Sequence, residues 1–259
     1  MNYRKAFRTV FPTYFVFPIL LVLFAVALHA QTAAPVAQAM RPFSKVAAGV
    51  NVGTLGIGAE VATPLSNRLN LRGGASFLSY SRNIESNGLT YIANLDLRSG
   101  QASLDWFPFG GSFHLSPGVM FYNGTKVGGS VQVPNDKSFT LNSVRYYSDP
   151  SDPLGGMADV TFPTAGPQFT IGFGNMLPRK KDKHFSVPFE LGFVYFGTGT
   201  ASLNFTGSAC TSSGGVNCQQ VNSFSAFQAN VAAEQSKIER DVKYARFYPV
   251  LRIGFSYKF

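Results

Sequence analysis

The sequence predicts an all-β fold, a closed antiparallel transmembrane β-barrel of about eight strands, within a range of about eight to ten. Three observations lead to this prediction. Apolar and polar residues alternate from residue 46 onward, charged residues share the parity of Gly, Ser and Asn, and short connections alternate with long ones. A short helix is predicted in the last long loop.

The amino-terminal thirty residues have the features of a secretory signal peptide. Arg4, Lys5 and Arg8 supply a basic start, and residues 11–28 are almost wholly apolar. An uncleaved membrane anchor is the alternative interpretation, because an apolar run of about 18 residues approaches the length of a membrane-spanning helix. In either case the segment is not part of the predicted barrel.

The rest of the chain is predicted to form one exported domain. Cleavage is expected after Ala30, with cleavage after Ala27 as the close alternative because small residues precede it. Residues 31–43 are then a periplasmic lead-in, and residues 44–259 form the barrel. No apolar run of comparable length follows the leader, which excludes a bundle of membrane-spanning helices.

From residue 46 onward, short alternating segments are separated by turn clusters rich in Gly, Asn, Ser or Pro. Alternation with a period of two is typical of strands that have one apolar face. In chain order, the apolar faces are Leu55, Ile57, Ala59 and Val61; Leu69, Leu71, Ala75 and Phe77; Tyr91, Ala93, Leu95 and Leu97; Ala102, Leu104 and Trp106; Phe113, Leu115, Val119 and Phe121; Phe169, Ile171 and Phe173; Phe189, Leu191, Phe193 and Tyr195; and Phe247, Leu251, Ile253, Phe255, Tyr257 and Phe259.

Two positions interrupt the alternation. The apolar parity jumps near Gly53 and Thr54, which we interpret as a tight hairpin. If this position were a bulge, another strand around residues 127–133 would be needed to keep the number of strands even. The parity slips again near residues 99–101, and here the pattern predicts a β-bulge inside one long strand.

The charged residues of the strands indicate which face points inward. They all lie on the parity opposite to the apolar residues: Glu60, Arg72, Asp96, Arg98, Asp105, Glu190 and Arg252. In a soluble sandwich the apolar faces would fill the core, but the aromatic residues are too numerous for one small core. A transmembrane barrel turns them toward lipid and places the charges in its lumen. There the charges are expected to pair, because an unpaired buried charge costs several kcal/mol.

The lengths of the connections agree with a barrel. The short ones are residues 66–68, 109–112 and 178–184, and the longer ones are residues 83–88, 124–166 and 206–243. Short periplasmic turns that alternate with long extracellular loops are typical of bacterial barrels. In the last loop, residues 226–242 lack Gly and Pro and are rich in Ala, Gln and Glu, which predicts a helix. We expect this helix to pack over a barrel mouth.

Cys210 and Cys218 lie in one Gly/Ser-rich stretch. An exported chain meets an oxidising compartment, where such a pair closes into a disulfide. A free redox pair is less favoured because the CxxC spacing is absent. His114 and His184, which follow the leader, are distant from both thiols in sequence. We therefore predict a disulfide in the loop, with no metal site and no cofactor.

The last twelve residues, YPVLRIGFSYKF, resemble the carboxyl-terminal strand of bacterial outer-membrane β-barrel proteins. The resemblance implies that Phe255, Tyr257 and Phe259 belong to the signal that the barrel-assembly machinery engages. The mature chain is also similar to the small outer-membrane β-barrel family, which includes the transmembrane domain of outer membrane protein A. This similarity implies a monomer in the bacterial outer membrane, with outer-membrane lipids and the assembly machinery as partners.

Two further groups of residues resemble functional sites. His114 and Ser116 share a strand face, and their spacing resembles the His and Ser pair of outer-membrane lipid A deacylases. However, they lie near the predicted periplasmic rim, whereas that substrate occupies the outer leaflet, so we predict no catalytic residues. The formal net charge is +9, but the only cluster of cations, in residues 179–183, fits a solvated turn better than a nucleic-acid interface.

The sequence thus predicts a non-enzymatic outer-membrane barrel with a structural role or a role in surface interactions through its external loops. A barrel of about eight strands is just wide enough to be filled by side chains, which favours a plugged lumen over an open pore. A narrow channel for ions or small solutes and a barrel-embedded lipid-modifying enzyme are the alternatives. No residue pattern identifies a ligand.

Overall fold

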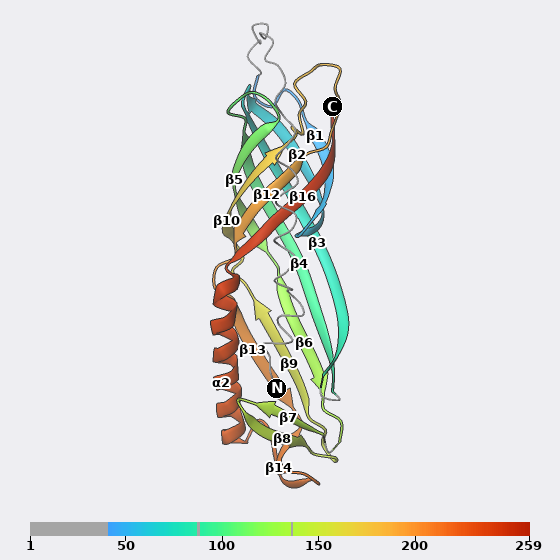
Figure 1. The fold of residues 1–259 in the computed structure, drawn as a ribbon, viewed down its shortest axis with the longest axis vertical. Coiled ribbons are helices and arrows are strands. Elements are labelled where there is room, and N and C mark those ends of the chain that lie inside the picture. Colours follow the sequence, from blue (N-terminus) through green and yellow to red (C-terminus); the bar gives the residue numbers. More distant parts are fainter. Residues whose placement is uncertain (1–40, 87–88, 136) are drawn as a thin grey trace, which may run out of the picture. The chain divides into compact units, whose positions relative to one another are not determined.

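The computed structural model describes residues 41–86, 89–135 and 137–259. The predicted leader and most of the predicted lead-in lie outside these residues. The described residues belong to one compact unit, Ala39–Phe259. This unit consists of a β-barrel that is continued at one end by further strands and a helix (Figure 1).

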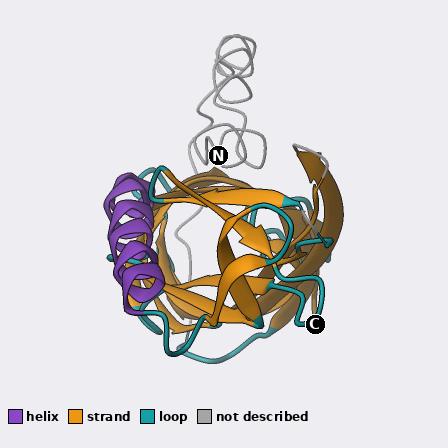
Figure 2. Ribbon diagram, turned by 90° about the horizontal axis from the view of Figure 1, so that it is seen from below, coloured by secondary structure: helices purple, strands orange, loops and turns teal. Residues whose placement is uncertain are grey.

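Eight antiparallel strands in the described part of the chain close into a ring (Figure 2). Neighbours pair in the order β4, β3, β2, β1, β16, β12, β10 and β5, and β5 then pairs with β4. The bounds are β1 Ala47–Gly53, β2 Gly56–Ser66, β3 Leu69–Ser86, β4 Leu89–Trp106, β5 Phe113–Asn123, β10 Gly166–Phe173, β12 Phe189–Tyr195 and β16 Phe247–Lys258. The predicted eight-stranded barrel is confirmed, and the interruption near Gly53 and Thr54 is the hairpin between β1 and β2.

The short connections meet at one end of the barrel, which we call the turn end. They are residues 67–68, residues 107–112 and the segment 174–188. The last of these contains the short strand β11 (Phe185–Ser186), which pairs with β16 beside β12. β1 begins and β16 ends at the turn end, so the predicted alternation of short and long connections is present.

The long connections at the opposite end fold into further β-structure, which we call the extension. One sheet continues from the outer half of β4 through β6, β9 and β13, and a smaller sheet lies at the far end (Figure 1). The sequence predicted loops here. The bounds are β6 Lys126–Gln132, β9 Gly155–Thr161 and β13 Thr200–Thr206 for the first sheet, and β7 Ser138–Leu141, β8 Val144–Ser148, β14 Ser208–Ser212 and β15 Val216–Gln220 for the second.

The predicted helix in the last long loop is confirmed as α2 (Ser225–Val242), which is followed by the 3-10 turn η1 (Lys243–Ala245). Phe227 and Val231 are buried in the apolar core of the extension, and the helix contacts β13 and β7. It lies along the side of the extension (Figures 1 and 2). The expectation that it packs over a barrel mouth is therefore wrong, because its apolar face is buried against the extension instead.

β4 runs without interruption from the barrel into the extension, and the polarity of its two faces inverts on the way. Its pairing with β3 is regular over the whole strand, and its odd-numbered residues point inward throughout. In the barrel the inward residues are polar, as at Gln101 and Asp105, whereas in the extension they are apolar, as at Leu97. The outward residues are apolar in the barrel, as at Trp106, and charged or polar in the extension, as at the exposed Arg98.

The predicted β-bulge in this strand is consequently wrong. The register shift at Gly100 and Gln101 lies in the pairing with β5, where Phe121 is the additional residue. Phe121 and Tyr122 are both exposed, as expected when two successive residues oppose one position of the neighbouring strand. The alternation of inward and outward residues in β4 keeps its phase. The apparent slip in the sequence arises because the interior changes from apolar in the extension to polar in the barrel.

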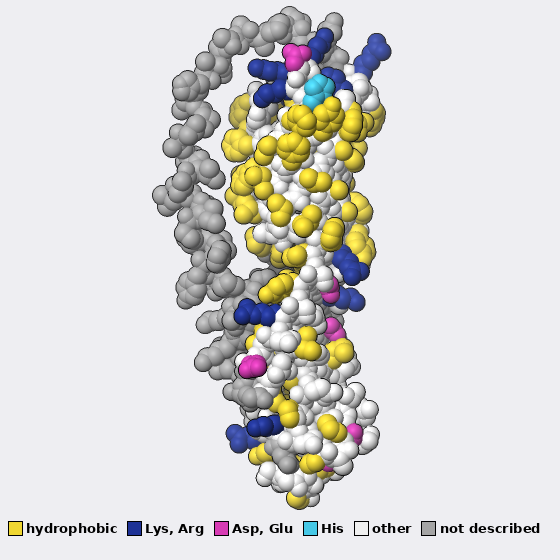
Figure 3. Space-filling view, turned by 90° about the vertical axis from the view of Figure 1, so that its right-hand side faces the viewer, with side chains coloured by type: hydrophobic (Ala, Val, Ile, Leu, Met, Phe, Trp, Pro, Cys, Tyr) yellow, Lys and Arg dark blue, Asp and Glu magenta, His cyan; other side chains and the backbone are white. Residues whose placement is uncertain are grey.

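The surroundings differ because the two parts of the unit have different cores. Aromatic and aliphatic side chains fill the extension and leave polar residues outside, as at Ser202 and Asn204 of β13. The barrel has the reverse arrangement, with polar residues inside and a band of apolar side chains on its outer face (Figure 3). The exposed apolar residues of the barrel include Val50, Val52, Ile57, Val61, Phe77, Trp106, Val119, Phe121, Ile171, Phe173, Leu191, Phe193, Ile253 and Phe255.

Candidate functional site

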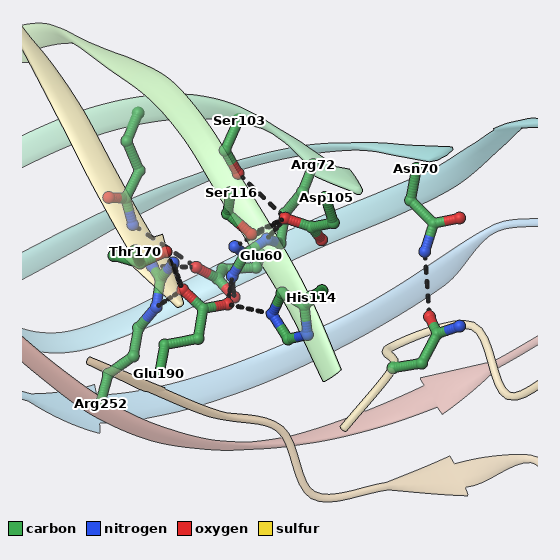
Figure 4. A network of polar contacts seen from close by, with 12 residues as sticks. Glu60, Asn70, Arg72, Ser103, Asp105, His114, Ser116, Thr170, Glu190 and Arg252 are labelled. Atoms are coloured by element: carbon green, nitrogen blue, oxygen red, sulfur yellow. Dashed lines mark hydrogen bonds and ion pairs between the residues drawn. The ribbon is translucent and has the colours of Figure 1, made fainter. Parts of the chain in front are cut away.

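Five charged side chains from five strands meet inside the barrel (Figure 4). They are Glu60 of β2, Arg72 of β3, Asp105 of β4, Glu190 of β12 and Arg252 of β16. All five are buried, because each occupies an inward position of its strand. We call this group the lumen network.

Arg72 contacts all three carboxylates of the lumen network. Its Nη2 lies 2.9 Å and its Nε 3.2 Å from Oδ1 of Asp105. Its Nη1 lies 3.4 Å from Oε2 of Glu60 and forms an ion pair with Glu190. One guanidinium group therefore links strands β2, β3, β4 and β12 across the lumen.

Arg252 links two of these carboxylates, Glu190 and Glu60. Its Nη2 donates to Oε2 of Glu190 at 2.6 Å, and its Nε donates to the same oxygen at 3.2 Å. Its Nη1 is paired with Oε1 of Glu60. Charged hydrogen bonds of this kind are the strongest in proteins, and here they join strands that are far apart in sequence.

Uncharged side chains complete the lumen network, and the sequence analysis did not identify them as members. Thr170 Oγ1 donates to Oε2 of Glu190 at 2.9 Å, and Ser116 Oγ donates to Oδ1 of Asp105 at 2.7 Å. Gln101 Nε2 lies 3.4 Å from Oε1 of Glu60. Their inward parity was visible in the sequence, but only charged residues were selected there.

His114 is the other side chain in contact with the network. Its Nε2 lies 3.5 Å from Oε1 of Glu190, and its ring centroid lies 5.1 Å from that of Phe107. Gly172 on β10 leaves the space for this ring, because a Cβ there would lie 2.6 Å from Nε2. Among the described residues no hydrogen bond joins His114 to Ser116, so they do not form a nucleophile and base pair here.

Two of the predicted members do not belong to the network. Asp96 and Arg98 lie in the part of β4 that has left the barrel, on its outward face. Asp96 accepts a hydrogen bond from Ser79 Oγ at 2.7 Å, and Arg98 is exposed. The prediction that they face the lumen has to be corrected, because the apolar residues around them point into the core of the extension.

The described residues contain two groups with the composition of a metal site. Asp105, His114 and Glu190 place one ligand atom each within 4.8 Å of one another, but both carboxylates are already paired with guanidinium groups. Asp149 lies near Cys210 and Cys218, but the two sulfur atoms form a disulfide. Neither group offers a free set of ligands.

The predicted disulfide is present between Cys210 and Cys218. It joins β14 to β15 at directly paired positions of the small sheet in the extension. Cys210 is fully buried beside Ala209, at the edge of the apolar core that includes Phe227. The bridge thus fixes the far end of the extension.

Apolar clusters lie on both sides of the network. Toward the extension, one cluster consists of Leu55, Met120, Val194, Phe196 and Val250, with Phe162 and Tyr248 packed against it. Toward the turn end, a second cluster consists of Ala47, Ala62, Met176 and Leu177. The ion pairs are therefore enclosed between two apolar layers.

The predicted assembly signal lies on the outer face of the barrel. Phe255, Tyr257 and Phe259 are exposed at the end of β16. Phe185 of β11 packs beside Phe255 and Tyr257, at ring distances of 5.4 and 5.1 Å.

None of the helices in the described part of the chain has both the length and the apolar character needed to cross a bilayer.

Comparisons with known proteins agree with this architecture. No protein-family model and no curated protein matches the chain. Among solved structures, the chain is similar to Acinetobacter baumannii CarO, with 23% identity and a TM-score of 0.52 over 85% of this chain and 98% of that chain. It is also similar to Acinetobacter baumannii CarO2, with 16% identity and a TM-score of 0.53 over 85% of this chain and 100% of that chain. The chain therefore has the fold of the small bacterial outer-membrane β-barrels.

Proposed function

We propose that the protein is a non-enzymatic structural protein of the bacterial outer membrane, whose plugged barrel anchors the extension at the cell surface. The observation that carries this proposal is the lumen network enclosed between two apolar layers. A barrel of this size has an interior that side chains can fill completely. A solute would have to displace both apolar layers and break several buried ion pairs to pass.

The orientation follows from the two ends of the barrel. Bacterial barrels have short turns on the periplasmic side and long connections outside. The turn end would then face the periplasm, and the extension with its disulfide would face the exterior. The outward apolar band of Figure 3 would meet lipid between them.

A narrow channel is the second candidate, and one observation favours it. Four buried lumen side chains have a polar atom without a protein hydrogen-bond partner among the described residues: Asn51, Ser99, Gln101 and Gln168. Buried polar groups need partners, so these positions favour hydrated space in part of the lumen. The two candidates predict opposite results in a conductance measurement.

We expect no steady single-channel conductance when the purified protein is inserted into planar bilayers, because both apolar layers would have to open. The mobility shift that barrels show on heating in detergent verifies folding, and flotation of the protein with lipid vesicles verifies insertion. The variant Phe196→Ala with Tyr248→Ala removes side chains from the apolar cluster toward the extension. It should conduct more often than the unaltered protein. Regular conductance steps from the unaltered protein would refute the plug and support the channel.

A pair of substitutions tests whether the apolar band contacts lipid. Ile253 in β16 and Ile92 in β4 are both outward-facing, with exposed fractions of 50% and 43%, but Ile92 belongs to the extension. In lipid, Ile253→Arg should lower the free energy of unfolding by about 2–4 kcal/mol. Ile92→Arg should change it by less than about 0.5 kcal/mol because that position faces water.

Urea unfolding in lipid vesicles gives both values. Equal and small effects would place both residues in water and would contradict the membrane location. Equal and large effects would contradict the assignment of the extension to the exterior.

A further inference from the structure

Cations gather at the turn end of the barrel, next to the apolar band (Figure 3). The members of this cluster, which we call the basic rim, are Lys45, Arg68, Arg179, Lys180, Lys181, Lys183 and Lys258. Asp182 is the acidic residue among them. Within the described part of the chain, no ion pair closer than 4.0 Å involves a cation of the basic rim.

The basic rim borders a cleft of about 460 Å³. Its lining includes Gly110, Gly111 and Ser112 from the turn between β4 and β5. Arg179 and Lys183 from the segment before β12 also line it. The volume lies in the range of small-molecule sites, and the lining includes the cations Arg179, Lys180 and Lys183.

Arg179 is held in place at this cleft. Its guanidinium carbon lies 5.4 Å from the centroid of the Phe107 ring. Its Nη1 lies 3.2 Å from the position that a Cβ on Gly110 would occupy, and Gly110 has a φ of 68°, which favours glycine. Burial and the neighbouring charge of Arg68 lower the pKa of Arg179. An anion in the cleft would relieve this repulsion.

Apolar side chains surround the same cleft on the lipid side. Phe185 and Val187 line it and are exposed, and Phe109 nearby is 81% exposed. Phe113 packs against both Phe109 and Phe173, which extends this aromatic surface along the barrel. The cleft therefore lies where aromatic side chains give way to cations, which is the level of lipid headgroups in a membrane barrel.

We propose that this cleft binds the phosphate of an anionic phospholipid in the periplasmic leaflet, with the acyl chains lying on the aromatic surface beside it. The proposal rests on the orientation in the proposed function. Arg179 would bind the phosphate through its planar guanidinium, and Lys183 would add charge attraction. The phosphate of the headgroup would contact the cations, and the acyl chains would contact the aromatic surface. A free phosphate ion has no acyl chains and would make only the first of these contacts.

The test compares lipids bound to the folded, full barrel in a neutral detergent, measured by native mass spectrometry. Phosphatidylglycerol should bind more tightly than phosphatidylcholine with the same acyl chains. In the variant Arg179→Gln with Lys183→Gln, binding of phosphatidylglycerol should weaken about 30-fold, since each basic side chain near a membrane surface contributes about fivefold. Arg179→Lys should weaken it less because the charge is kept.

The matched control is Lys126→Gln with Arg145→Gln, which removes the same charge from exposed positions of the extension. It should leave the preference for phosphatidylglycerol unchanged. Equal binding of the two lipids, or an equal loss in the control, would overturn the proposal. Displacement of phosphatidylglycerol by an equal concentration of inorganic phosphate would also overturn it, because the site would then select free phosphate.

The outcome is separable from that of the conductance measurement. A barrel that conducts and still prefers phosphatidylglycerol would refute the plugged lumen and leave the lipid site standing. A silent barrel without this preference would refute the lipid site alone.

Discussion

Replacing Glu190 by Ala is expected to lower the free energy of unfolding of the barrel by about 3–5 kcal/mol, because breaking a buried ion pair leaves uncompensated charge. Glu190 is 2% exposed and is bound by Arg72, Arg252 and Thr170. Its removal leaves two guanidinium groups facing only Glu60 and Asp105. Urea unfolding in lipid vesicles measures the effect.

Asp182→Ala is the control, because that carboxylate is exposed at the turn end and should contribute little. The double variant Glu190→Ala with Arg252→Ala should be less destabilised than the sum of the single variants, since each removes the other's partner. Additive effects would contradict direct coupling of Glu190 and Arg252. A loss below about 1 kcal/mol for Glu190→Ala would contradict the role of the network in stability.

Replacing Phe227 by Ala should destabilise the extension by about 3–5 kcal/mol, the usual cost of removing a fully buried Phe. Its side chain is 0% exposed, and its ring lies 5.0 Å from that of Tyr146 and 5.3 Å from that of Phe205. These contacts join α2 to both sheets of the extension. Hydrogen exchange followed residue by residue should show faster opening of β8 and β13.

β1 and β2 should keep their protection in this variant, because none of their residues belongs to the buried cluster that contains Phe227 among the described residues. Tyr244→Ala is the control, since Tyr244 is 91% exposed in η1. Equal loss of protection in β1 and β2 would show that barrel and extension unfold as one unit. Unchanged protection in β8 and β13 would contradict the role of Phe227.

Much of the fold could be predicted because strand alternation and connection length are local properties of the sequence. The eight barrel strands, α2 and the disulfide all follow from such local patterns. Residues 127–133, which overlap β6, were named as a strand only in the alternative interpretation. The other strands of the extension were missed because most are short, as in β7 with four residues and β8 with five. Strand pairing in the extension, as of β6 with β4 and of β13 with β9, depends on contacts distant in sequence.

The errors at Asp96 and Arg98 have one physical origin. Alternation shows that a strand has two faces, but it does not show which face meets the interior. An outward apolar face along the whole chain holds for Trp106 and fails for Leu97. The slip at residues 99–101 was the signal in the sequence that could have revealed this change. The same parity points inward along all of β4, while the interior changes from apolar to polar at these residues.

In the proposed membrane location, the inversion along β4 would also determine how deep the protein lies in a bilayer. Sinking by two residues, about 7 Å of strand, would carry Arg98 into hydrocarbon. Rising by the same amount would draw Arg179 and Lys183 away from the headgroups. A bilayer of another thickness would therefore have to stretch or thin around the protein. The extension would then stand at a set height above the lipid.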